Sequence, residues 1–256
     1  MTKTSKIMIN NIRGLSFISP NIINIYCTLR KIEMAKLLKT CHDPATFLEF
    51  GIDEAGRGPL FGRVYVAAVV LPKDCESFRH DWMKDSKLIK SRKKMTELAE
   101  YIKTNAIAWH VYFAEASDVD SLGILNCVIR GMHHCVNEIV KAMNLTVSNL
   151  SSSLLLVDGN YFRPFVRYDE STESLVTVPH ETVEKGDGTY SSIAAASILA
   201  KNARDTYVEV LCKEHPELCE KYSLHTNMGY GTKAHFEGIR AHGITEWHRR
   251  SFKGVV

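Results

Sequence analysis

The sequence predicts an α/β fold in which helices cover a β-sheet. Short apolar runs of strand length alternate along the chain with longer segments of helical character, and this alternation is the first observation behind the prediction. The second is size, because 256 residues, 45% of them hydrophobic and 24% charged, suffice for one well-buried domain but not for two large ones. We therefore expect one domain with appendages.

The first 33 residues differ in composition from the rest of the chain. They contain several basic residues and many Ile, Asn, Ser and Thr, whereas no acidic residue precedes Glu33. Such a composition is typical of an organellar transit peptide. The alternative is an extension upstream of a true start at Met34, and both interpretations stay open. In either case we expect residues 1–45 to form an N-terminal extension.

The first elements of the domain are expected to form a β-hairpin. An apolar strand starts at Phe47 and ends in Gly51-Ile52-Asp53-Glu54. The β-branched run from Val64 to Leu71, bounded by Pro72, is typical of a buried strand. We expect these two strands to pair with each other.

A helix, a third strand and a long helix follow in the pattern. Ser91 is a suitable N-cap for a helix from Arg92 to about Thr104, because its hydroxyl can accept a hydrogen bond from a free N–H of the first turn. A strand is expected around Trp109 to Ala114, and one long helix fits Val119 to Met143.

Two more strands are predicted in the second half of the chain. Leu154 to Val157 is closed by Asp158-Gly159-Asn160, which predicts a central strand that runs into a tight turn. After a polar surface loop at 169–174, the segment from Leu175 to Val183 predicts a strand that ends at Lys185-Gly186-Asp187-Gly188.

Two predicted helices complete the domain. The first runs from Ser191 to Leu211, and its small residues at 194–197 allow close backbone packing. The second is shorter and runs from Lys233 to Ala241.

Composition narrows the class of protein. The net charge of +3 is compatible with nucleic-acid binding but does not by itself indicate it. The seven cysteines are odd in number and include no Cys-x-x-Cys pair, so we expect reduced thiols in a reducing, cytoplasmic compartment, unless the N-terminal extension directs the chain to an organelle. No uncharged apolar run approaches the roughly 18 residues that span a bilayer, which argues against a membrane protein.

Four acidic residues each end an apolar strand or lie in a glycine-bearing turn just after one: Asp53, Glu54, Asp158 and Asp187. Side chains at the carboxyl ends of strands can converge, and clustered carboxylates repel one another unless a divalent cation neutralises them. Oxygen ligands of this kind suit Mg²⁺ or Mn²⁺ better than Zn²⁺. Two such ions, about 3.5–4 Å apart, would support hydrolysis of a phosphodiester. Taken alone, however, each acid is more often a turn former.

The segment Gly56-Arg57-Gly58-Pro59 follows the first two acids directly. Its backbone N–H groups are unhindered by side chains and lie beside a cation, which suits a phosphate and its neighbouring sugar. A glycine-rich hairpin turn without a binding role is the structural alternative.

Several longer strings are specific to one family. The most specific is GIDEAGRGPLFG at 51–62, followed by VYVAAVVLP at 64–72. Further strings follow in the same order: DSK at 85–87, LGILNCVIRGM at 122–132, LLLVDGN at 154–160, KGD at 185–187, SIAAASILAKNARD at 192–205, MGYGTKAHFEGIRAHG at 228–243 and HRRSF at 248–252. From Phe47 to Phe252 the chain thus resembles the type 2 ribonuclease H family, ribonuclease HII, in its bacterial form.

The resemblance implies a fold and a set of site residues. The fold is a ribonuclease H-like mixed five-stranded sheet flanked by helices, with a catalytic core at 46–215 and a small helical, substrate-binding part at 216–256. The implied metal ligands are the four acids named above, with two Mg²⁺ or Mn²⁺ ions bound during catalysis. The implied substrate contacts are Gly56, Arg57 and Gly58 at the ribonucleotide 2′-OH and its phosphate, and Tyr230 on the neighbouring sugar.

The implied activity is that of an endonuclease. It would hydrolyse the RNA strand of RNA/DNA hybrids and cut 5′ of ribonucleotides embedded in duplex DNA, leaving a 5′-phosphate and a 3′-hydroxyl. We expect a monomer without an obligate protein partner. No segment that resembles a sliding-clamp-binding tail is found.

Two alternatives compete with this activity. One is a catalytically silent or partner-dependent hybrid-binding module, against which the intact acids and the bacterial-type ending argue. The other is a different nuclease or an integrase of the same superfold, which should lack the arginine motif and the tyrosine.

Basic residues and histidines carry less information. Candidates for phosphate contacts are Lys87, Lys185, Lys201 and Arg204, although such residues are as often solvated or paired structurally. The spacing of the histidines at 225, 235, 242 and 248 matches no zinc pattern, so we expect most of them to be structural or exposed. We expect residues 248–252 to tie the C-terminal part to the core.

One departure from the family pattern concerns the groove. Asn227 and Met228 stand where many bacterial members have a basic residue or pair. One positive charge in the substrate groove is therefore expected to be missing, with weaker substrate affinity as its consequence.

Overall fold

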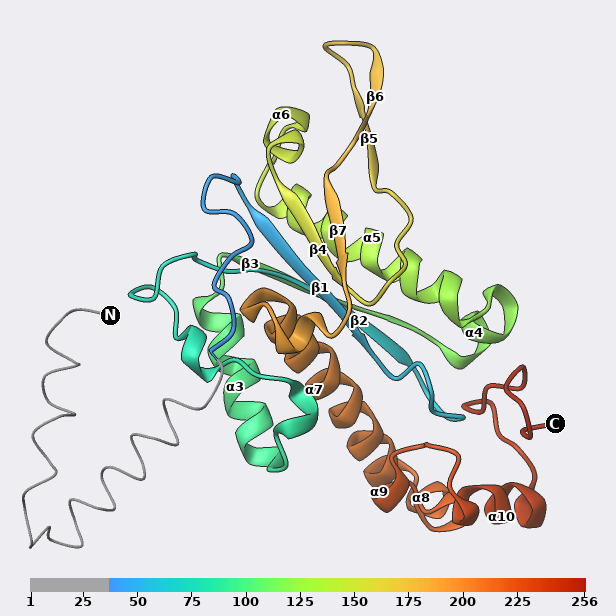
Figure 1. Ribbon diagram of the computed structural model, residues 1–256. Helices are drawn as coiled ribbons and strands as arrows, with labels where there is room; N and C mark the ends of the chain where they lie inside the picture. The colour runs from blue at the N-terminus through green and yellow to red at the C-terminus, as the bar shows by residue number, and fades with distance from the viewer. Residues whose placement is uncertain (1–36) are drawn as a thin grey trace, which may run out of the picture. The chain divides into compact units, whose positions relative to one another are not determined.

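The computed structural model describes residues 37–256, so the interpretations of residues 1–33 lie outside the described part of the chain. Leu38–Val256 form one compact unit. Its centre is a five-stranded sheet in the order β3 (Ala108–Ala114), β2 (Val64–Val70), β1 (Glu49–Ala55), β4 (Leu154–Asp158) and β7 (His180–Val183) (Figure 1). The pairs β1–β2 and β2–β3 are antiparallel, whereas β1–β4 and β4–β7 are parallel. The expected mixed sheet and its β1–β2 hairpin are confirmed.

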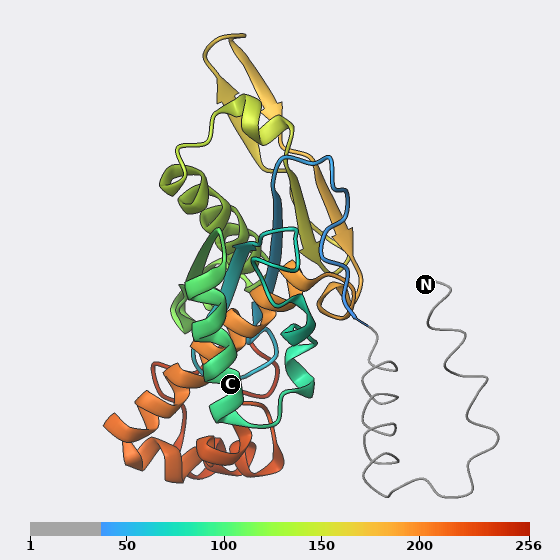
Figure 2. The ribbon, with the colours of Figure 1, turned by 90° about the vertical axis from the view of Figure 1, so that its left-hand side faces the viewer.

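Helices cover both faces of this sheet: α5 (Ile124–Ala142) lies on one face, and α3 (Arg92–Asn105) and α7 (Ser191–Glu214) lie on the other (Figures 1 and 2). Two separate cores result, because successive residues of a strand point to opposite faces. Phe50 and Ile52 belong to the core under α5, whereas Ala67 and Val69 belong to the core under α3 and α7.

The first turn of α7 lies against the middle of β1. A Cβ atom at Gly51 would stand 2.1 Å from the backbone carbon of Ser192, so only glycine permits this approach. On the helix side, Ala194, Ala195 and Ala196 are fully buried, as expected from their small size. This contact fixes α7 directly beside the carboxyl end of β1.

The N-cap prediction for α3 is confirmed. The Ser91 hydroxyl accepts a hydrogen bond from the Lys94 N–H at 3.3 Å, and the helix extends from Arg92 to Asn105. The predicted third strand and the helices expected from Ser191 and Lys233 are also present.

One predicted helix is wrong in its continuity. The segment expected as a single helix from Val119 to Met143 is divided into α4 (Ala116–Leu122) and α5. Gly123, with φ +79°, ends the first and precedes the second. Glycine adopts this left-handed backbone conformation at little cost, and the chain changes direction there.

The strand expected from Leu175 to Val183 is also wrong in its continuity. It consists of β6 (Ser174–Thr177) and β7, which belong to different sheets. Pro179 separates them, since proline lacks an N–H and restricts the residue before it. β6 pairs with β5 (Val166–Asp169) in a hairpin that the sequence did not predict, and the polar loop is its tip, which projects from the rest of the fold (Figure 1).

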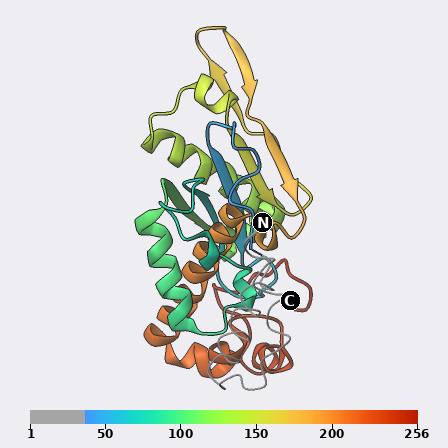
Figure 3. The same cartoon turned by 60° about the vertical axis from the view of Figure 1, so that its left-hand side comes forward.

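Three helices make up most of the C-terminal part: α8 (Pro216–Tyr222), α9 (Leu224–Asn227) and α10 (Lys233–His242). They lie at the end of the molecule opposite to the β5–β6 hairpin (Figure 3). Their apolar side chains share a cluster with Phe61, from the loop between β1 and β2. Phe61 also forms an isolated bridge with His248, and Arg249 donates to the carbonyl oxygen of Gly62 at 3.0 Å. The expected tie between 248–252 and the core is confirmed.

The remaining elements are short: α6 (Val147–Ser151), and the 3-10 helices η2 (His80–Trp82), η3 (Ser86–Leu88) and η4 (Gly186–Gly188). All six cysteines between residues 37 and 256 are free thiols. In the same part of the chain, no helix is both long and apolar enough to cross a membrane.

Candidate active site

The carboxyl end of β1 carries the first two acids. Asp53 is 4% exposed, and one of its carboxylate oxygens accepts the Glu54 N–H at 2.7 Å. Burial raises the pKa of Asp53 well above its ordinary value, and the neighbouring charges of Glu54 and Asp158 raise it further. Burial also raises the pKa of Glu54, against the opposing effect of Arg57, whose guanidinium lies 3.3 Å from its carboxylate.

The third acid ends the neighbouring strand. β1 and β4 run parallel and pair Ile52 with Val157, so Asp53 and Asp158 follow at the same edge of the sheet. Asp158 Oδ1 accepts the N–H of Gly186 at 2.7 Å, and this bond fixes the turn that contains Asp187. A Cβ at Gly186 would stand 2.6 Å from the terminal carbon of Ile193 and 3.2 Å from Asp158 Oδ1, so a larger residue here would require the Ile193 side chain to shift.

The fourth acid lies in that turn. Asp187 is 5% exposed, and its carboxylate lies 3.5 Å from the Lys87 ammonium. Burial raises the pKa of Asp187, Lys87 opposes this shift, and the charges of Asp85 and Asp158 add to it. Three of the four acids thus hold a proton more tightly than they would in water.

Each carboxylate is engaged with a partner of its own. Within residues 37–256, no three Asp, Glu, His or Cys side chains enclose a common point closely enough to hold a metal ion. The chemistry of the donor set fits a hard divalent cation all the same. It supplies oxygen atoms only, from carboxylates that are buried or half-buried at one edge of the sheet and repel one another.

The glycine-arginine-glycine segment forms the next wall of the site. Gly56 has φ +93°, a left-handed conformation that favours glycine, and carries the chain from β1 into the loop. A Cβ at Gly58 would lie 3.5 Å from the ring of Tyr230, so the tyrosine faces this loop. The Arg204 guanidinium lies 5.4 Å from the centre of the same ring, which is half exposed.

These residues line one cleft of about 260 Å³. It brings together most of the predicted site residues: Asp53, Glu54, Gly56, Arg57, Gly58, Lys87, Asp158, Lys201, Arg204 and Tyr230. Two predicted residues do not line it. Asp187 does not line the cleft but contacts Lys87, which does, and Lys185 is exposed at the left-handed position that begins η4.

Three polar lining residues escaped the sequence argument for the site: Ser86, Ser197 and Asp205. Asp205 accepts from Lys201 and from Arg204, each at 3.0 Å, so both basic side chains have the structural pairing that the sequence left open. The hydroxyl groups of Ser86 and Ser197 lie 3.0 Å apart and hold η3, with Lys87, against α7. All three lie inside strings that carry the family resemblance, which was the available signal.

The backbone of Tyr230 is held by the C-terminal part. The carbonyl oxygen of Tyr230 lies 3.0 Å from Nδ1 of the buried His235, and Arg204 donates to the carbonyl oxygen of Met228. Asn227 is 8% exposed, donates to the Tyr222 carbonyl oxygen and accepts the Gly229 N–H, each at 2.7 Å. Asn227 therefore shapes the turn before Tyr230 and does not face the groove.

The glycine-arginine-glycine loop is held by an arginine of the C-terminal part. Arg249, which is fully buried, donates to the carbonyl oxygens of Pro59 at 2.9 Å and of Arg57 at 3.2 Å. Burial lowers the pKa of Arg249 to about 10, which leaves it charged at neutral pH. Its guanidinium thus holds the backbone of the glycine-arginine-glycine segment in place.

A protein-family model described as ribonuclease HII matches residues 50–255, nearly the whole described part. The chain belongs to the ribonuclease HII family. Ribonuclease HII from Parabacteroides distasonis is 42% identical over 205 residues, which cover 80% of this chain and 89% of the relative. The Neisseria meningitidis enzyme is 38% identical over 208 residues, which cover 81% and 93%.

Solved structures give the same result for the fold. The Archaeoglobus fulgidus ribonuclease HII, solved in complex with PCNA, is 25% identical, with a TM-score of 0.58 over 80% of this chain and 95% of that one. Ribonuclease HIII solved with Mn²⁺ is 16% identical, with a TM-score of 0.59 over 84% and 70%, and shares the fold. The expected ribonuclease H-like architecture is confirmed.

Ribonucleases HII are endonucleases that use divalent metal ions. As a member of the family, the chain cleaves RNA in RNA/DNA hybrids and at ribonucleotides embedded in DNA. The prediction of an enzyme is confirmed, and the silent-module alternative is set aside.

Proposed function

We propose that the chain cuts on the 5′ side of a ribonucleotide by a two-metal mechanism, leaving a 5′-phosphate and a 3′-hydroxyl. The observation that carries this proposal is the meeting of Asp53, Glu54 and Asp158 in one cleft with the glycine-arginine-glycine loop and Tyr230. The candidate groups for phosphate chemistry and those for ribose recognition thus line the same cleft. Asp187, 3.5 Å from the Lys87 ammonium, would complete the set.

Asp53, Glu54, Asp158 and Asp187 would hold two Mg²⁺ or Mn²⁺ ions. When bound, the ions lower the pKa of a water and stabilise the charge of the leaving oxygen. The raised pKa values of Asp53, Glu54 and Asp187 support this role, because burial and mutual repulsion leave an excess of negative charge that a cation relieves. The basic partners of Glu54 and Asp187 compete weakly with a cation, since the Arg57 and Lys87 contacts are 3.3 and 3.5 Å long.

The loop and the tyrosine select the ribonucleotide. Backbone N–H groups of Gly56 and Gly58 and the Arg57 side chain contact the 2′-OH and the adjacent phosphate, and the Tyr230 ring packs on the neighbouring sugar. The 2′-OH is the one group that distinguishes RNA from DNA at a single position. The short separation between Gly58 and the Tyr230 ring supports a shared contact with one nucleotide.

Among the lysines, Lys87 is the strongest candidate for a phosphate contact. Its side chain is 79% exposed and its single ion pair is 3.5 Å long, so it is free to move to a phosphate. Lys201 would contribute charge from its place beside Asp205, and Lys185 would contact the backbone outside the cleft. Residues 216–256 would bind substrate through Tyr230, with residues 46–215 as the catalytic core and 1–45 as an extension.

The enzyme acts as a monomer without an obligate protein partner, in the cytoplasm. The cleft supports this proposal because one chain supplies all of its lining residues. Free thiols among the described residues support a reducing compartment. An organelle is the alternative location if the first 33 residues act as a targeting segment.

The test uses purified chain with two labelled substrates, a duplex that carries one embedded ribonucleotide and an all-RNA/DNA hybrid, each with Mg²⁺, Mn²⁺ or EDTA. We expect cleavage on the 5′ side of the lone ribonucleotide, lost in EDTA. Cleavage of the hybrid alone would overturn the roles given to Arg57 and Tyr230. Cleavage that persists in EDTA would overturn the metal assignment.

A further inference from the structure

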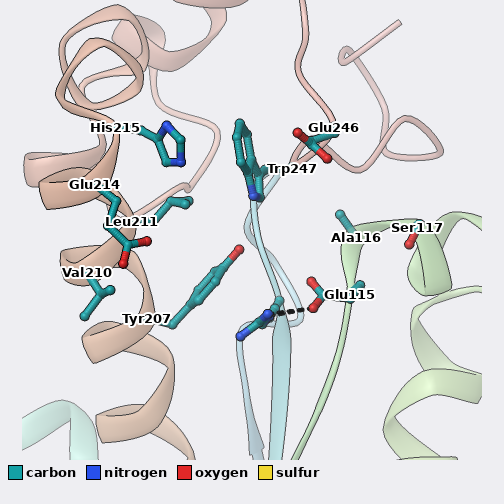
Figure 4. A pocket seen from close by; sticks show the side chains of 11 residues that line it. Glu115, Ala116, Ser117, Tyr207, Val210, Leu211, Glu214, His215, Glu246 and Trp247 are labelled. Carbon is teal, nitrogen blue, oxygen red and sulfur yellow. Dashed lines mark hydrogen bonds and ion pairs between the residues drawn. The ribbon is translucent and has the colours of Figure 1, made fainter.

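A second cavity, of about 570 Å³, lies away from the acids (Figure 4). The second half of α7 forms one wall, the start of α4 forms another, and the loop after α10 closes it. Its lining includes three aromatic rings and three carboxylates: Tyr207, His215 and Trp247, with Glu115, Glu214 and Glu246.

This cavity shares no lining residue with the active-site cleft among residues 37–256. The cleft uses the α7 residues up to Asp205, whereas the cavity uses those from Tyr207 onward. A molecule held there would leave the acids and the glycine-arginine-glycine loop free. The nuclease reaction therefore does not explain the presence of this cavity.

Part of the cavity already holds a guanidinium group. The Arg63 guanidinium carbon lies 4.5 Å from the centre of the Tyr207 ring, and Nη2 of Arg63 lies 2.7 Å from the Glu115 carboxylate. The cation is thus stacked on an aromatic ring and paired with an acid. Both interactions favour arginine, whose planar, weakly hydrated head stacks well and pairs with carboxylates through two N–H groups.

The rest of the cavity also has aromatic rings and carboxylates, but no lysine or arginine among the described residues lines it. The rings of His215 and Trp247 lie 5.2 Å apart. Glu246 lies next to Trp247, and Glu214 lies on the α7 side of the cavity, below His215 (Figure 4). Within residues 37–256, the ion pairs made by lining residues are Arg63–Glu115 and His215–Glu217, and neither Glu214 nor Glu246 takes part in one. Three glutamates and one arginine give the lining a net charge of −2, although the whole chain carries +3.

We propose that this cavity binds a guanidinium group of a second molecule, stacked on Trp247 and paired with Glu214 and Glu246. The group would belong either to a free guanidino compound or to an arginine side chain of a partner protein. An ammonium group would form one point contact, whereas a guanidinium satisfies a flat ring and two carboxylates together.

The test is titration calorimetry on the full chain with agmatine, a free guanidino compound, and with a capped Gly-Arg-Gly peptide. The matched peptide carries citrulline, which has the same shape as arginine but no charge. We expect a Kd of about 1 mM or tighter for at least one guanidinium ligand, no binding of the citrulline peptide, and a shift of the Trp247 indole N–H signal in NMR spectra. Preference for agmatine would assign a free compound, and preference for the peptide would assign a partner's arginine.

The variant is Glu214→Gln combined with Glu246→Gln, which we expect to weaken binding about tenfold or more. Its control is Glu170→Gln combined with Glu220→Gln, an equal change of charge at two exposed positions outside the cavity. Both variants should keep full cleavage of the hybrid, which also verifies folding. Equal binding of the citrulline peptide, equal affinity of the two variants, or no binding of either guanidinium ligand would each overturn the proposal.

Discussion

His235 and His248 face each other through their Nε2 atoms, which lie 3.3 Å apart in the buried C-terminal part. Nδ1 of His248 lies 3.0 Å from the Thr245 N–H, so it accepts, and the proton of His248 is on Nε2. That proton is donated to His235, whose own proton is on Nδ1 and is donated to the Tyr230 carbonyl oxygen at 3.0 Å. The chain of bonds requires two neutral imidazoles.

Acidification should therefore destabilise the protein through this pair. Burial, with the nearby His235, lowers the pKa of His248 to about 4, below its ordinary value of 6.5. The unfolded state then binds a proton more readily, so this contribution to stability is complete above about pH 6.5 and is lost as the pH falls toward 4. The loss amounts to about 2–3 kcal/mol.

Melting temperatures of the wild type and His248→Asn between pH 7 and 4.5 measure this effect. The variant should melt lower at pH 7 but change less with pH. His242→Asn, at an exposed position on α10, serves as the control and should keep the wild-type slope. Parallel pH profiles for wild type and His248→Asn would contradict the prediction.

Asp53→Asn should abolish cleavage and leave binding of the hybrid largely intact. The substitution removes a proposed metal ligand but keeps the size of the side chain, so we expect kcat to fall about 1000-fold or more. Cleavage assays and fluorescence anisotropy with a labelled hybrid measure the two effects. Asp169→Asn, at the end of β5, is the control, and retained cleavage in Asp53→Asn would refute the metal assignment.

Tyr230→Ala should impair cleavage at a single embedded ribonucleotide. Loss of the ring opposite Gly58 leaves the sugar unplaced, and misplacement of this kind costs about 100-fold in kcat/KM. Steady-state kinetics on the embedded substrate measure the loss. Tyr168→Ala, at an exposed tyrosine of the β5–β6 hairpin, should behave as wild type, and equal kinetics for both variants would exclude the role of Tyr230.

Gly51→Ala should destabilise the whole domain. The added methyl group would stand 2.1 Å from the backbone of α7, and neither the helix nor the central strand can give way cheaply, so we expect a loss of about 3 kcal/mol. Urea denaturation measures the free energy of unfolding. Gly188→Ala is the matched control, because nothing lies within 4 Å of a Cβ at that position. A loss below that of the control would show that the contact relaxes easily.

The sequence predicted the parts of the fold that follow a simple period or a local rule. The β1–β2 hairpin has long apolar runs, and Ser91 supplies a side-chain cap, so both were recognisable. β5 and β6 are four residues each and only half hydrophobic, and the polar segment at 169–174 lies between them. Most of β6 was therefore assigned to one strand with β7, and its pairing with β5 was not recognised. Gly123 was missed as a break because a glycine inside a helical pattern is often tolerated.

Among the site residues, too, some were recognisable from the sequence and others were not. The acids are recognisable because each follows an apolar strand, whereas Asp205 lies on a helix among basic residues and reads as an exposed ion pair. Lys185 matched the family string, yet the backbone at this residue places it outside the cleft. The carboxylate that a long basic side chain contacts depends on how α7 packs against η3. No local pattern in the sequence predicts this packing.

The bonds from Arg249 to the loop after β1 have a consequence for the biosynthesis of the enzyme. Arg249 and Arg57 are 192 positions apart, and the ribosome makes the loop first. Until Arg249 emerges, the carbonyl groups of Arg57, Pro59 and Gly62 lack the donor that orders them. The sheet can assemble during translation, but the loop after β1 is ordered only after Arg249 has been translated, so the candidate active-site cleft is completed late.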